Sequence, residues 1–153
     1  LRLFLWRTYD KVVMRFLQHT TEAHEISEEA FFQSRRSGGT CISTAYELMT
    51  NIVAKEYPLS EWNIYGAQCT DGENSLDDME RAVNLLAENV LPVVQYFAYA
   101  EITTRPDSTP STLWQLFAEV ARSHHELAMR KIAEKSDIYP IFRSFFEQKE
   151  PRT

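Results

Sequence analysis

The sequence is poor in the features that mark several classes of protein. Its 153 residues include only two cysteines, Cys41 and Cys69, too few for a disulfide framework, so we expect reduced thiols and a cytoplasmic location. It has no apolar run near the roughly 20 residues that cross a bilayer, and no signal-peptide pattern. The formal net charge of -6 disfavours nucleic acids and anionic membranes as partners, because both require a positive field.

The remaining composition is that of a globular protein, with 44% hydrophobic and 25% charged residues. The length suits one domain and is short for two. The first residues, with Leu1, Phe4 and Leu5, already follow the apolar spacing of a helix. We therefore expect residues 1–153 to be a single domain that forms the C-terminal fragment of a longer protein.

Strand-like and helix-like segments alternate along the chain. A run that is apolar on both faces predicts a buried strand at 12–19, and a more polar pattern predicts an edge strand at 21–26. Further strands are predicted at 62–69, which a turn-rich run closes, and at 92–102, while the short run 127–132 is ambiguous and could be the last strand. Stripes at helical spacing predict helices from Cys41 to before Pro58, over 79–90, over 113–124 and from Asp137. Ser75 and Asp78 have the spacing of a capping box. The alternation predicts a doubly wound sheet with helices on both faces.

Two loops of this predicted sheet are positioned to bind a ligand. In open α/β sheets, ligands bind beyond the carboxyl ends of the strands. Residues 37–40 directly precede the helix that begins at Cys41, and residues 70–74 directly follow the strand over 62–69. Cys41 and Cys69 border the same loops, and we interpret both as buried, inert thiols.

The residue types in these loops suit a hard cation. Gly38 and Gly39 let backbone approach a ligand, Thr40 offers a hydroxyl at a helix start, and Asp71 offers a carboxylate with Gly72 allowing a sharp turn. Hydroxyl and carboxylate oxygens are ligands of Mg²⁺, Ca²⁺ and Mn²⁺. The alternative is that Thr40 is only an N-cap and Asp71 only a turn residue.

Longer motifs resemble a bacterial family. They are Phe31-Phe32 through Gly38-Gly39-Thr40, 62–68 into Asp71-Gly72, Leu91-Pro92-Val93-Val94, Glu101-Ile102-Thr103, and Asp137-Ile138-Tyr139-Pro140 with Phe142-Arg143. Together they resemble the YeaH/YhbH family of unknown biochemical function, whose C-terminal half is similar to a von Willebrand factor A domain. The resemblance implies a Rossmann-like three-layer α/β sandwich, with a mostly parallel sheet and one antiparallel edge strand.

The resemblance also implies a metal-ion-dependent adhesion site built from three loops. Thr40 matches the second loop and Asp71 the third, while the Asp-x-Ser-x-Ser of the first loop is absent from the sequence. We therefore expect little bound Mg²⁺ in this fragment, and a cation only in the full-length protein. The first strand, central in such sheets, would be missing between the strands over 12–19 and 62–69. Those strands could close up, a second copy could fill the gap by self-association, or the rest of the protein could supply the strand.

Three functions remain open at this point. The first is a metal-dependent protein-interaction module, not an enzyme, in which Gly38, Gly39, Gly72, Glu73 and Asn74 border the partner. The resemblance implies a regulatory role in bacterial stress or sporulation responses, beside a PrkA-type serine protein kinase. The second is a metal-dependent hydrolase, for which no histidine is placed beside Asp71 by sequence. The third is a metal-free scaffold.

Overall fold

A computed structural model of the chain describes residues 9–33, 41–103 and 109–147. The strands in them are β1 (Phe16–His19), β2 (Ala23–Ile26), β3 (Tyr65–Thr70), β4 (Tyr96–Ile102) and β5 (Leu127–Ile132). The α-helices are α2 (Glu28–Gln33), α3 (Ile42–Glu56), α4 (Leu76–Leu85), α5 (Thr112–Ala121) and α6 (Ile138–Glu147). The segment 127–132, ambiguous in the sequence, is thus a strand.

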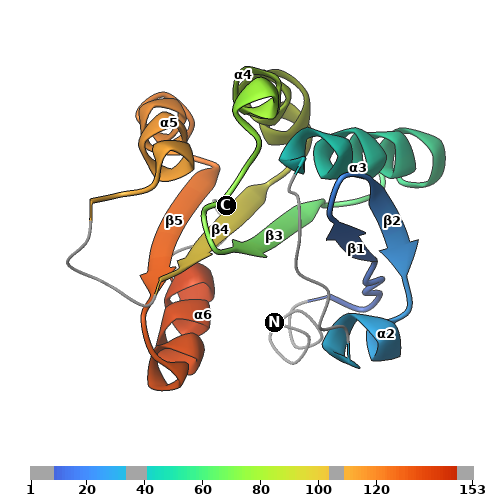
Figure 1. Cartoon of the computed structure of the whole chain (residues 1–153). Helices are drawn as coiled ribbons and strands as arrows, with labels where there is room; N and C mark the ends of the chain where they lie inside the picture. Colours follow the sequence, from blue (N-terminus) through green and yellow to red (C-terminus); the bar gives the residue numbers. More distant parts are fainter. Residues whose placement is uncertain (1–8, 34–40, 104–108, 148–153) are drawn as a thin grey trace.

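The strands form two separate sheets. β3, β4 and β5 lie side by side in that order and run parallel, while β1 and β2 form an antiparallel pair. Helices α3, α4 and α5 lie on one side of the strands, and α2 and α6 lie on the other (Figure 1). The mixed α/β architecture and the parallel order agree with the Rossmann-like prediction.

Of the three outcomes left open for the missing central strand, closing up of its two neighbours is not found in the described residues. Within them, no strand pairing joins β1 to β3. The two strands have not closed up, although they would be neighbours across one missing strand. Among the described strands, β1 is paired with β2 only and β3 with β4 only.

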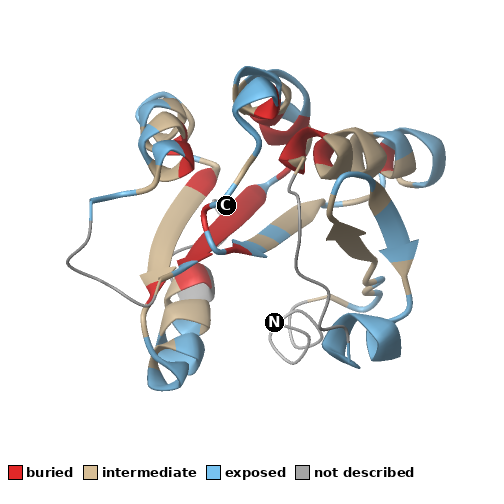
Figure 2. Ribbon diagram, in the orientation of Figure 1, coloured by how far each residue is buried: buried red, intermediate tan, exposed pale blue. Residues whose placement is uncertain are grey.

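The core lies mainly between the parallel sheet and helices α3, α4 and α5. Every residue of β4 except Ile102 is buried (Figure 2). Helix α3 forms because Ile42, Tyr46 and Val53 recur at helical spacing and bury one face. The Tyr46 ring meets the Phe97 ring edge-on, with 6.0 Å between centroids. Burial of these large side chains is the main driving force for this layer.

Gly66 in β3 allows the Phe97 ring to pack directly against the backbone. A Cβ atom at this position would lie 2.3 Å from Cδ2 of Phe97. Because the ring is buried and closely packed, it has little room to move aside. Glycine is therefore required here by the packing of β3 against its neighbours.

Helix α4 does not end at Leu85 but changes its winding. Residues Leu86–Val90 form a π-helical turn, η1, and Leu91–Val93 form a 3-10 turn, η2, that contains Pro92. Leu86 and Val90 are fully buried, and Leu91 nearly so. The strand expected from residue 92 begins at Tyr96 instead, because 91–93 continue the helical rod.

Candidate ligand-binding rim

Three segments meet beyond the carboxyl end of β3. The backbone N–H of Cys41 donates to the carbonyl of Thr20, at 2.7 Å, in the turn between β1 and β2. The backbone N–H of Ile42 donates to Oδ1 of Asn74, at 3.1 Å, in the loop after β3. We call residues 19–20, 41–43 and 71–74 the rim. The start of α3 and the loop after β3 are thus neighbours, while residues 37–40 lie outside the described residues.

Thr40, Gly38 and Gly39 lie outside the described residues. The residue that caps the N-terminus of α3 is Cys41, which makes no side-chain capping bond. Thr40 directly precedes Cys41 in the sequence, and Cys41 is bound to the turn between β1 and β2. Cys41, the residue that follows the predicted ligand Thr40, therefore belongs to the rim.

Asp71 presents an exposed carboxylate at the tip of β3. Its Oδ1 accepts a hydrogen bond from the backbone N–H of Glu73, at 3.1 Å. Gly72 has φ 84, a backbone conformation that other residues rarely adopt, and its N–H donates to Oγ1 of Thr70. This Asx-type turn fixes the direction of the carboxylate. No second protein group within the described residues binds the other carboxylate oxygen.

Asp78 holds the rim together from α4, which differs from the sequence prediction. Its Oδ2 accepts from the backbone N–H of Ser43 at 3.0 Å, and its Oδ1 accepts from the Ser43 hydroxyl. Ser75 makes no side-chain cap, so the expected capping box is wrong. The carboxylate instead satisfies a free N–H in the first turn of α3, where helix ends favour negative charge. Spacing within one helix could not reveal this partner.

Glu101 is a buried carboxylate beneath the rim that residue spacing alone did not single out. Its Oε2 accepts from the Tyr99 hydroxyl at 3.1 Å and from the Ser111 hydroxyl at 2.6 Å. Burial raises the pKa of Tyr99, and the nearby Glu101 carboxylate acts in the same direction, so the phenol keeps its proton and donates. A Cβ on Gly72 would lie 2.7 Å from Oε2. The sequence signal is a glutamate inside an otherwise apolar strand.

His19 lies near Asp71, which the sequence did not predict. Burial lowers the pKa of His19, and the carboxylates of Asp71 and Asp78 act in the opposite direction. Nδ1 of His19, Nε2 of Gln68 and Nδ2 of Asn74 are buried and have no hydrogen-bond partner among the described residues. Such groups are uncommon in folded proteins and mark a polar region whose hydrogen bonding is incomplete.

The rim fits a hard cation in its chemistry and lacks a full set of ligands. Asp71 supplies an exposed carboxylate, whereas the oxygens of Asp78 and the Oδ1 of Asn74 are engaged in holding α3. Across the part of the chain that the structure describes, no three His, Cys, Asp or Glu side chains converge as a metal site would require. A hard cation bound here would take its other ligands from water, from 34–40 or from another segment.

Cys69 corrects the expectation of two buried thiols. Cys41 is half-buried, but Cys69 is exposed on β3. Cys69 is exposed because β3 is an outer strand of the three-stranded sheet and no helix among the described residues covers this part of it.

Within the described residues, no helix combines the length and the apolar character that crossing a membrane demands.

Comparison with known proteins gives one consistent result. A family model described as "Protein of unknown function (DUF444)" matches residues 1–149. A UPF0229 protein of Thiobacillus denitrificans is 45% identical over 149 residues, which cover 97% of this chain and 35% of that protein. A UPF0229 protein of Ectopseudomonas mendocina is 44% identical over 150 residues, covering 97% and 35%. The chain thus spans about a third of these relatives. No solved structure matches it.

Proposed function

The chain belongs to the DUF444 family, whose function is unknown, and we propose that it is the larger part of a von Willebrand factor A-like module that binds a protein partner through a divalent cation at the rim. The observation that carries this proposal is the exposed, turn-fixed carboxylate of Asp71, in the loop whose Asn74 binds the first turn of α3. A cation held there on one side leaves coordination positions for a carboxylate of a partner.

The ligand roles that we propose come from the sequence motifs and the family resemblance, and the exposed carboxylate of Asp71 supports them. Asp71 binds the cation directly, and Thr40 and solvent supply further oxygens. Gly38, Gly39, Gly72, Glu73 and Asn74 border the site and contact the partner. The remaining ligands come from the part of the longer protein that this chain does not include. A PrkA-type serine protein kinase in the cytoplasm, encountered in stress or sporulation responses, is the partner that we propose from the family resemblance.

Calorimetric titration with Mg²⁺ and Mn²⁺ tests the cation step in a full-length protein that contains this chain. We expect Asp71→Ala to weaken binding at least tenfold, which corresponds to about 1.4 kcal/mol. Asp77→Ala is the matched control, because Asp77 is an exposed aspartate six residues away in the first turn of α4. Equal affinity of the Asp71→Ala variant and the unmodified protein would refute the site.

Binding of the kinase in the presence and absence of a chelator tests the interaction step. The proposal requires that removal of the cation and Asp71→Ala each reduce kinase binding, while Asp77→Ala does not. Binding that ignores both the chelator and Asp71→Ala would show that the partner uses another surface.

One observation favours a second candidate function, a metal-dependent hydrolase. His19 lies near Asp71 and its neutral form is favoured by burial, so it is the group that could accept a proton from a cation-bound water. A hydrolysis screen with generic phosphate and ester substrates separates this candidate from the first. Turnover that is lost in His19→Asn but kept in His24→Asn, an exposed histidine on β2, would favour the enzyme.

A further inference from the structure

A buried contact lies directly beneath the turn that presents Asp71. Gly72 is buried, and a Cβ atom placed on it would lie 2.7 Å from Oε2 of Glu101 and 3.0 Å from Cβ of Ser111. The backbone of the turn therefore packs against these two side chains without a gap. Because Glu101 is itself only 3% exposed, the turn has little room to sink toward the core.

The carboxylate of Glu101 is held by two hydroxyl groups from different elements. The Tyr99 hydroxyl comes from the same strand, β4, and the Ser111 hydroxyl comes from the residue before α5. Both donate to Oε2, the oxygen that lies against Gly72. Hydrogen bonds to a carboxylate are stronger than those between neutral groups, so these two bonds fix the position of this oxygen.

The two donors are themselves anchored in the core and in α5. The Tyr99 ring is fully buried and meets the Phe117 ring of α5 edge-on, with 5.0 Å between centroids. Ser111 is the N-cap of α5, and its Oγ accepts from the backbone N–H of Trp114 at 2.9 Å. The position of Glu101 therefore depends on the first turn of α5.

On its outer side, the turn sets the direction of the Asp71 carboxylate. The N–H of Gly72 donates to Oγ1 of Thr70 at 3.3 Å, and the N–H of Glu73 donates to Oδ1 of Asp71 at 3.1 Å. An exposed carboxylate on such a short turn keeps one direction only if the turn is supported from below. Metal ligands in proteins are commonly oriented in this way by residues that do not touch the ion.

We propose that Glu101 is a positioning residue for the cation site: it supports the turn that directs Asp71 and connects this turn to the start of α5. The inference rests on the proposed function, because it assigns Glu101 a role toward the cation that Asp71 binds. It also gives the site a means of regulation. A partner that displaces the first turn of α5 would change the affinity of the rim for the cation, and the cation would affect that partner equally.

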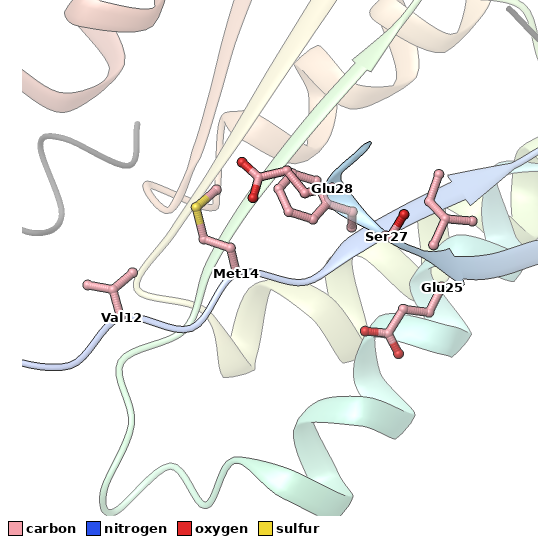
Figure 3. Close-up of a pocket in the computed structure, with 7 residues that line it drawn as sticks. Val12, Met14, Glu25, Ser27 and Glu28 are labelled. Atoms are coloured by element: carbon pink, nitrogen blue, oxygen red, sulfur yellow. The ribbon is translucent and has the colours of Figure 1, made fainter. Parts of the chain in front are cut away.

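Glu101 fulfils this role through the protein and not through a ligand of its own. The pocket in Figure 3 is lined by residues from the segment before β1, from the β1–β2 pair and from the start of α2, among them Val12, Met14 and Glu28. The side chains around Glu101 do not line this pocket. Loss of the Glu101 side chain is therefore expected to affect Asp71 and α5, and not the surface around this pocket.

Calorimetric titration of the full-length protein with Mn²⁺ tests the positioning role. We expect Glu101→Ala to weaken Mn²⁺ binding about tenfold or more, as the loss of a residue that orients a metal ligand does. Glu101→Gln keeps the volume and an acceptor oxygen, so its affinity should stay within about threefold of the unmodified protein. Phe117→Leu is the matched control, because it loosens the packing of α5 and leaves Glu101 intact; its affinity should not change.

The same titration separates this inference from the proposed function. If Asp71→Ala weakens Mn²⁺ binding and Glu101→Ala does not, the cation site stands and the positioning role is wrong. Glu101→Gln as weak as Glu101→Ala would mean that the charge of Glu101 matters and its position does not, which also overturns the role. If Asp71→Ala has no effect either, the proposed function fails.

A milder variant serves if Glu101→Ala does not fold. Tyr99→Phe removes one hydroxyl donor to Glu101 and keeps the buried ring, so it should weaken Mn²⁺ binding about threefold, as the loss of one ordinary hydrogen bond does. Affinity equal to that of the unmodified protein would count against the positioning role.

Residue-resolved hydrogen exchange without metal gives a readout that does not depend on the cation. We expect Glu101→Ala to speed exchange about tenfold or more at the amide of Glu73, which bonds to Asp71, and at the amide of Trp114, which bonds to Ser111. The amide of Ala98, in the middle of β4, is the internal control and should not change. Unchanged exchange at Glu73 would show that the turn does not depend on Glu101 and would overturn the proposal.

Discussion

Replacing Asp78 by alanine tests how the rim is held to the core. The Asp78 carboxylate is 7% exposed as a residue and accepts two hydrogen bonds from Ser43, one from its N–H and one from its hydroxyl. A hydrogen bond to a charged group contributes about 1.5–3 kcal/mol, and loss of a helix cap costs about 1 kcal/mol. Because the two terms overlap at the Ser43 N–H, we expect a total loss of about 3 kcal/mol in the free energy of unfolding.

Urea unfolding of the chain, followed by far-ultraviolet circular dichroism, measures this loss. With a slope of roughly 2 kcal/mol per molar urea, the midpoint should fall by about 1.5 M. Asp78→Asn keeps one acceptor oxygen and should lose about half as much. Asp77→Ala removes an exposed charge from the same helix turn and should cost about 0.5 kcal/mol. If Asp78→Ala and Asp77→Ala had the same midpoint, the proposed cap on α3 would be wrong.

Three further perturbations probe other contacts. Gly66→Ala should destabilise the fold by about 2 kcal/mol through its clash with Phe97, and Phe97→Leu should recover part of that loss in a double-mutant cycle; additive effects would argue against the clash. Gly72→Ala, at φ 84, should cost about 1–2 kcal/mol and weaken cation binding in calorimetry, whereas unchanged affinity would separate the turn from the site. The Arg15 guanidinium lowers the pKa of Glu25 below its ordinary value of 4.5, so the stabilisation from this ion pair is present above pH 4.5 and is lost as the pH falls through the lowered pKa. The difference in melting temperature between the protein and Glu25→Gln should therefore shrink below about pH 4. A difference that stays constant would contradict the ion pair.

Periodicity predicted the elements that bury one continuous face. The stripe from Cys41 to Val53 predicted α3, which the structure places at Ile42–Glu56, because burial of that stripe decides its conformation. Of the strand predicted over 12–19, only Phe16–His19 forms a strand, β1. Its first residues include Val12, Val13 and Met14 but pair with no strand in the part of the chain that the structure describes, and apolar character alone does not form a ladder. Sequence patterns report burial, whereas strand length depends on partners distant in the chain.

The candidate site was predictable in its location and less so in its chemistry. Loops at strand ends are read directly from the order of elements, which indicated Asp71 and Gly72. The roles of Asp78 and Glu101 depend on contacts with Ser43 and Ser111 from other elements. His19 reaches the rim only because the β1–β2 hairpin packs against α3. Residues that act across elements need the fold before their partners can be named.

The π-helical turn after α4 has a consequence for how this segment can change in length. A π turn is an α-helix into which one residue has been inserted, and here the insertion falls between Leu85 and Leu91. Because the turn holds the additional residue as a local bulge, removing one residue of 86–90 would restore regular winding and leave Leu91 facing the interior. The register of Tyr96–Ile102 against both neighbours would also be kept, whereas a deletion inside that strand would exchange the two faces of the most deeply buried strand.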